Sequence, residues 1–322
     1  MTGTRIAAAC FLLLGILSGT LFFYRDEWPL SKLIKEYYAN VSTELVSIGI
    51  TVLIIESLNE RQQSKQFQAQ LIRELGSTDN GFALRALREL QATGALRNGS
   101  LTGASLEKAN LLGARLESAV LEEVVFDSAV LSSANMRYAK LSKVRMIKAR
   151  LQQIECYQTD FTAAMMSEAN MSGAFLNQCI LDNAILRNAI MQNVKIQNSS
   201  LRKVDLIGAN LGKSNLSDCK LTFSQLEEAI LTEVDLTNSN LESSNLLRAN
   251  LERAILRNAN LTRVNLRSSN LKSTDLEDSI LQGSELDGAR YNSDTKWPSD
   301  FNPEVAGAIL EDSVEKDREP EI

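Results

Sequence analysis

The sequence predicts an all-β solenoid, a chain that turns a corner every five residues, behind an α-helical N-terminal region. The first observation is a strict period. From Leu101 to Leu286 every position ending in 1 or 6 is apolar, which makes 38 units, of which 29 centre on Leu. The second is a small residue two positions before nearly every centre. A period of five fits neither a helix nor a flat strand, whose apolar faces recur every 3.6 or two residues. Two side chains per unit are therefore expected to point inward.

The N-terminal region, residues 1–56, is predicted to form two transmembrane helices arranged as a hairpin. Residues 6–24 contain no charge and are long enough to span a bilayer as a helix. A cleavable signal peptide is the alternative, but no small-x-small cleavage site precedes the charged segment RDEW. Residues 37–55 form the second span, which carries Glu44 inside it.

Four residues of these spans are candidates for helix packing. Gly15 and Gly19 form a G-x-x-x-G pair, a spacing that allows close approach of two helices. Their partner is either the Gly49 face of the second helix or another protomer, which would make a homo-oligomer, and the pair is also compatible with chance. Glu44 is costly within a membrane, so it faces the first helix or reaches the headgroups, and a proton site is a minor alternative.

Residues 57–100 are predicted to be juxtamembrane and capping helices. Residues 57–75 continue the second helix, Gly76 ends it, and 77–80 offer caps for a helix at about 79–93. We expect that helix to cover the open first coil, because the ends of a solenoid need a cap.

The repeat, residues 101–290, reads A-[N/D]-L-x-x, as in RANLERAILRNANLTRVNL. This pattern resembles the pentapeptide-repeat family over 101–286. The resemblance implies a right-handed quadrilateral β-helix, in which four five-residue sides make a twenty-residue coil. The pattern is weakest at 151–166, where Ile154 is bulky and Cys156 replaces Leu, so we expect a bulge or a kink there.

The C-terminal residues 291–322 are predicted to be a cap followed by an acidic disordered tail. The pattern ends after Tyr291, and Trp297, Phe301 and Ile309 are expected to cover the last coil. The remaining segment, EDSVEKDREPEI, is highly charged.

The outward positions offer one candidate interaction surface. A basic band with no acid among its members precedes the irregular stretch, and a valine band is expected to lie beside it. These side chains are either a solvated face or a docking surface for a protein or for anionic lipid headgroups. The basic band is Arg137, Lys140, Lys143, Arg145, Lys148 and Arg150, and the valine band is Val120, Val125 and Val130.

The composition argues against an enzyme. The chain has no His, which removes the commonest general base and metal ligand. Its four Cys fit neither a zinc site nor a compact disulfide framework. We therefore expect no catalytic, cofactor or metal site. Residues 101–290 hold 21 basic and 22 acidic residues, a balance that argues against a nucleic-acid partner.

The leading hypothesis is a non-enzymatic membrane-tethered scaffold whose partners are the lipid bilayer and an unidentified protein. The alternatives are a DNA-mimicking topoisomerase-binding protein, a function known in the family, and a regulatory subunit of a membrane transport complex. Four basic residues flank the spans outside and three lie in the loop between them, so we expect both ends in the cytoplasm. The predicted location is a bacterial inner membrane or a thylakoid membrane, with a multi-pass anchor and a cytoplasmic repeat domain.

Overall fold

The computed structural model describes residues 3–23 and 32–312, with side chains for 6–18 and 40–312. The chain divides into two compact units, Met1–Gln70 and Leu71–Ile322.

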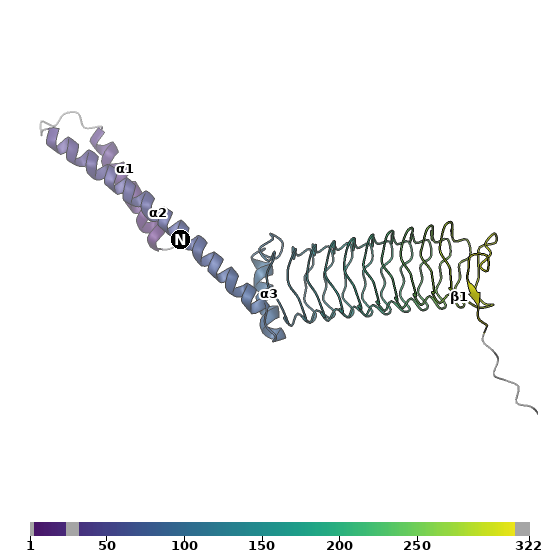
Figure 1. Ribbon diagram of the computed structural model, residues 1–322. Helices are drawn as coiled ribbons and strands as arrows, with labels where there is room; N and C mark the ends of the chain where they lie inside the picture. Colours follow the sequence, from purple (N-terminus) through teal and green to yellow (C-terminus); the bar gives the residue numbers. More distant parts are fainter. Residues whose placement is uncertain (1–2, 24–31, 313–322) are drawn as a thin grey trace, which may run out of the picture. The chain divides into compact units, whose positions relative to one another are not determined.

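The first unit is a pair of helices, α1 (Gly3–Phe23) and α2 (Lys32–Leu75). The two helices run side by side in Figure 1. By length and composition, one helical segment with described side chains, Asn40–Leu75, is apolar enough to cross a membrane. The described apolar part of α1, Ile6–Ser18, is shorter.

The second unit begins with the end of α2 and with α3 (Asn80–Ala92). The Asp79 side chain caps α3 by accepting a hydrogen bond from the backbone N–H of Phe82 at 3.0 Å. The Asn80 amide donates to the carbonyl of Asn110 in the first coil at 3.1 Å, so α3 also satisfies backbone groups that the first coil leaves free. The buried residues of α3 are Ala83, Ala86, Leu87 and Leu90.

The rest of the second unit is a stack of twenty-residue coils (Figure 1). From Ser105↔Val125 to Asn270↔Arg290, each residue at a position ending in 0 or 5 forms a parallel bridge with the residue twenty positions later. All the unit centres from Leu101 to Leu286 are buried, and the most exposed of them is only 7% accessible. The small positions from Ala109 to Ser279 are buried as well, so the prediction that two side chains per unit point inward is correct.

Hydrogen bonds explain the Asn or Asp that precedes many centres. The Asn250 side-chain oxygen accepts the backbone N–H of Glu252 at 3.1 Å, and Asp235 accepts that of Thr237 at 3.0 Å. Each side chain thus holds the first residue of the corner that follows it, as in an Asx turn. The next corner residue has a positive φ in almost every unit, as at Arg248 (57°).

The irregular stretch at 151–166 does not contain the bulge that the sequence predicts. Arg150 pairs with Asn170 in the regular twenty-residue register, so no residue is inserted. Ile154 and Cys156 are both fully buried within one unit. A large residue at the small position and a small residue at the centre exchange volumes, and this preserves the packing of the coil.

The C-terminal end is closed by β1 (Arg290–Tyr291) and β2 (Ile309–Leu310), which pair in parallel. Trp297 stacks on Phe301 with ring centroids 5.3 Å apart, and both pack against the core as expected. Ile309 does not cover the last coil. It lies in β2 and is 50% exposed, because β2 attaches to the coil through its backbone rather than its side chains.

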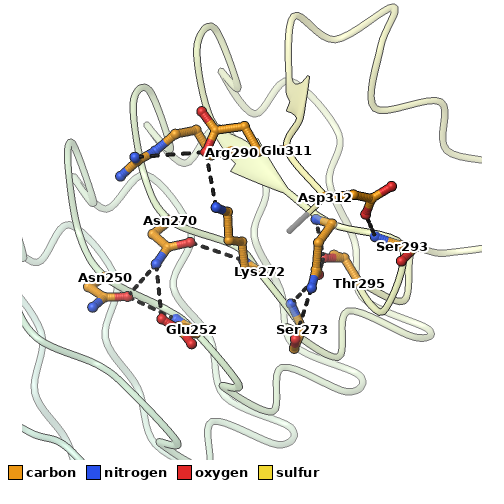
Figure 2. Close-up of polar contacts among 11 residues, drawn as sticks. Asn250, Glu252, Asn270, Lys272, Ser273, Arg290, Ser293, Thr295, Glu311 and Asp312 are labelled. Atoms are coloured by element: carbon orange, nitrogen blue, oxygen red, sulfur yellow. Dashed lines mark hydrogen bonds and ion pairs between the residues drawn. The ribbon is translucent and has the colours of Figure 1, made fainter. Parts of the chain in front are cut away.

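Ion pairs and hydrogen bonds stabilise this end of the rod (Figure 2). Glu311 forms ion pairs with Lys272 at 3.0 Å and with Arg290 at 4.0 Å. Asp312 accepts the backbone N–H of Ser293 at 2.7 Å. The first two residues of the segment EDSVEKDREPEI, which the sequence predicts to be disordered, therefore make defined contacts, and the rest of it, 313–322, lies outside the described residues.

Candidate functional site

The valine band and the basic band lie in adjacent coils and in register. Val120 bridges to Lys140, and the next two valines bridge to Arg145 and Arg150 in the same way. Successive bridge positions are separated by a corner, so the three pairs occupy three consecutive sides of the rod. The predicted residues therefore partly encircle the rod and do not form one flat patch.

Half of the basic band is neutralised by acids of neighbouring coils. These acids precede or follow the band in the sequence, and only the stacking of coils brings them close. Among the described residues, Lys140 and Arg150 have no carboxylate within ion-pair distance. The three pairs are Lys143 with Glu123 (3.1 Å), Arg145 with Asp127, and Lys148 with Glu168 (3.5 Å).

Arg137, the first member of the band, contacts an aromatic ring instead of a carboxylate. Its guanidinium lies 5.6 Å from the ring centroid of Tyr157. The edge of Tyr138 also meets Tyr157, with centroids 5.7 Å apart. On the following coil Lys195 lies over the ring of Phe175 at 5.4 Å.

An open cavity of about 300 Å³ lies among these side chains, and we call it the aromatic cleft. Sequence reasoning missed it because 138, 157 and 175 hold different places in their units. A sequence signal exists, since these aromatic residues follow one another at intervals close to one coil. The cleft is lined by Arg137, Glu155, Cys156, Tyr157, Phe175 and Asn177.

The buried thiols of the coils are not poised for chemistry. Cys179 donates its S–H to the carbonyl of Cys156 at 3.0 Å, and Cys219 donates to Ile196 at 2.9 Å. Burial raises the pKa of Cys179 and of Cys219 to about 12, so neither is a thiolate at neutral pH. Among the residues that the structure describes, no three His, Cys, Asp or Glu side chains gather in a metal-binding group.

Comparison with known sequences identifies the repeat. The family of pentapeptide repeats matches eight overlapping times, which together run from residue 95 to residue 290. The chain belongs to the pentapeptide-repeat family. Its fold is therefore a right-handed β-helix, and members of the family are generally non-enzymatic structural or interaction modules. The matched segments are 95–122, 109–153, 139–178, 176–206, 199–238, 219–258, 244–283 and 259–290.

Solved structures of other pentapeptide-repeat proteins resemble this one. HetL, involved in heterocyst differentiation regulation in the cyanobacterium Nostoc sp. strain PCC 7120, is 25% identical. The match covers 63% of this chain and 92% of HetL, with a TM-score of 0.52. A trypsin-treated variant of QnrB1, a plasmid-mediated fluoroquinolone resistance protein, is 16% identical over 58% of this chain and 91% of its own, with a TM-score of 0.36. No curated protein matches the sequence.

In this pentapeptide-repeat protein, α1 and α2 pack through glycines. A Cβ added to Gly15 would lie 2.9 Å from a methyl group of Val46 and 3.0 Å from the carbonyl oxygen of Ser42. A Cβ added to Gly49 would lie 2.8 Å from the Leu12 side chain. Each helix thus presents a glycine where the other comes closest.

Of the other two predicted packing residues, the structure places only Glu44. Glu44 is exposed on the surface of the helix pair and does not face α1. The surroundings of Gly19 lie outside the described side chains.

Proposed function

We propose that this protein is a non-catalytic, membrane-tethered scaffold, in which α1 and α2 anchor the pentapeptide rod and the rod binds a protein partner. The coil geometry is the observation that carries this proposal. Backbone bonds repeat every twenty residues along the whole rod, so outward side chains are held at a spacing of about 4.8 Å. Such a surface recognises a partner without first becoming ordered, and binding therefore costs little conformational entropy.

The exposed apolar surface of α2 supports the membrane anchor. Within the described residues of the first unit, several isoleucines of α2 leave about half of their surface uncovered by protein. A soluble protein rarely exposes so continuous an apolar surface, whereas a bilayer would cover it. We propose a bacterial inner membrane or a thylakoid membrane, with the rod in the cytoplasm. The isoleucines are Ile48 (48%), Ile50 (47%), Ile54 (54%) and Ile55 (52%).

The unpaired cations of the basic band support a docking role. Lys140 and Arg150 each stand beside a valine of the preceding coil, so each offers a charge next to an apolar side chain. Charges that lack an internal partner are free to pair with a partner protein, and they steer its approach.

Three measurements test the scaffold. Reporter fusions after residue 60 and at the C-terminus should both report the cytoplasm, and the chain should sediment with membranes and resist carbonate extraction. Crosslinking of full-length protein in intact membranes should give a reproducible adduct that Lys140→Glu with Arg150→Glu removes. Arg263→Glu, an exposed cation elsewhere on the rod, is the matched control. Recovery of the protein in the soluble fraction would refute the membrane tether. An adduct that forms equally well in the Lys140→Glu, Arg150→Glu variant and in the Arg263→Glu control would refute docking at the basic band.

A further inference from the structure

The aromatic cleft has the composition of a binding hot spot. Outward aromatic residues are rare on the sides of the rod, yet Tyr138, Tyr157 and Phe175 gather here around Arg137. Tyr and Arg are enriched among the residues that contribute most binding energy at protein interfaces. Phe175 is 44% and Tyr138 44% exposed, so the coil does not need their burial for its own stability.

The charges of the cleft depart from the pattern that the rest of the rod follows. Elsewhere, three of the four Arg residues that come just after a centre pair with the acid eighteen residues later, on the next coil, and the fourth, Arg202, pairs with Asp182. Arg137 and Glu155 stand in the same register, but no ion pair joins them, and Arg137 lies over Tyr157 instead. One cation and one carboxylate are therefore left free at the rim of the cleft. The regular pairs are Arg187 with Asp205 (2.6 Å), Arg257 with Asp275 (2.7 Å) and Arg267 with Glu285 (3.3 Å).

The irregular unit borders the cleft. Cys156 lines the cleft at the place where a regular unit has Leu. Its side chain points into the coil and is 1% exposed, and the coil keeps its register across this unit. The departure from the repeat therefore has a counterpart at the surface, as expected where sequence rules are broken for function.

We propose that the aromatic cleft binds an extended segment of a protein partner, which inserts an apolar side chain between Tyr157 and Phe175 and pairs a carboxylate with Arg137. Lys195, which also has no ion pair among the described residues, adds positive charge on the next coil. Arg137 and Lys195 together outweigh the carboxylate of Glu155, and this excess of positive charge specifies an acidic partner. Glu155 accepts a backbone N–H of the segment.

Recognition at this cleft proceeds through side chains. The backbone around it is already paired, since the N–H of Glu155 donates to Ala134 at 3.0 Å and that of Phe175 donates to Ile154 at 2.9 Å. A partner therefore cannot add a strand to the side of the rod, as it can to an open sheet edge. This specifies the partner class of the proposed scaffold and rests on that proposal for its biological setting, although binding at the cleft needs no membrane.

A random-sequence peptide phage library, panned on full-length protein in detergent micelles, tests the proposal. Recovered peptides should carry an aromatic or aliphatic residue close to Asp or Glu. Their affinity should fall at least about tenfold on Tyr157→Ser and on Arg137→Glu, and it should not change on Arg263→Glu. Phe175→Ser provides a second cleft variant should Tyr157→Ser fail to fold.

Three results would overturn the cleft assignment: no enriched peptide, a preference for basic peptides, or equal binding to the Tyr157 and Phe175 variants. Failure of the scaffold gives a different result, because a chain that does not sediment with membranes still binds these peptides.

Discussion

Two adjacent leucines allow a direct measurement of what the five-residue period contributes. Leu111 is a unit centre with no exposed surface, whereas Leu112, the next residue, is 48% exposed. Leu111→Ala removes a fully buried side chain and leaves a cavity inside the hydrogen-bonded coils. The free energy of unfolding should therefore fall by about 2–5 kcal/mol. Leu112→Ala removes a side chain already half in water and leaves no cavity, so we expect a loss of about 0.5 kcal/mol or less.

Urea unfolding of the full-length protein in detergent, followed by circular dichroism, measures both losses. The same substitution at neighbouring positions changes composition and helix propensity equally, so the difference between the variants reports the direction of the side chains. A difference of about 2 kcal/mol or more is expected, with similar denaturant slopes. Equal shifts of the midpoint would show that centres and corner residues are equivalent, and the inward ladder of leucines would then be wrong.

Three further results are expected. Gly15→Val should lower the SDS fraction at which the helix pair loses helicity, because the new side chain overlaps α2, while Leu14→Val on the exposed side should not. In a Cys10→Ser background, the three buried thiols should resist a thiol reagent at pH 8 and react fully in urea; labelling of the folded protein would contradict their raised pKa values. Burial acts to raise the pKa of Asp182, but hydrogen bonds from Ser200 and Arg202 lower it below its ordinary value. Its contribution to stability is therefore present above an unfolded pKa of about 3.9 and is lost as the pH falls through the folded value, so Asp182→Asn should reduce the acid sensitivity of the urea midpoint.

The fold could be predicted because the same five-residue pattern occurs in every unit of the rod. Every centre from Leu101 to Leu286 tests the same period, so single departures such as Phe126 do not obscure it. The bulge predicted at Cys156 was wrong for a related reason. That prediction compared each position separately with the repeat pattern. The packing of the coil depends instead on the summed side-chain volume of Ile154 and Cys156.

The surface could be predicted only in part, because outward contacts join residues that the sequence separates. The basic band was recognised as a run of charges, but its acidic partners are 18 to 20 residues away and become neighbours only after the coil is wound. Folding thereby neutralises half of the band. The aromatic cleft was missed for the same reason, since Tyr138 and Tyr157 meet across coils.

These two outcomes suggest how a repeat rod acquires a specific site. Inward positions are constrained by the core, and outward positions can vary at little cost, so most outward variation carries no information about binding. A functional site is better marked where an inward position also departs from the repeat and a neighbour compensates. Only the unit holding Ile154 and Cys156 combines a bulky residue at the small position with a centre smaller than Leu. The surface above this unit holds free charges and exposed aromatic rings. Cys156→Leu alone should therefore strain the coil, whereas Cys156→Leu with Ile154→Ala should restore a regular unit, retain the register and remove the irregular unit from beneath the cleft. Peptide binding that survives in that double variant would show that the irregular unit and the cleft are unrelated.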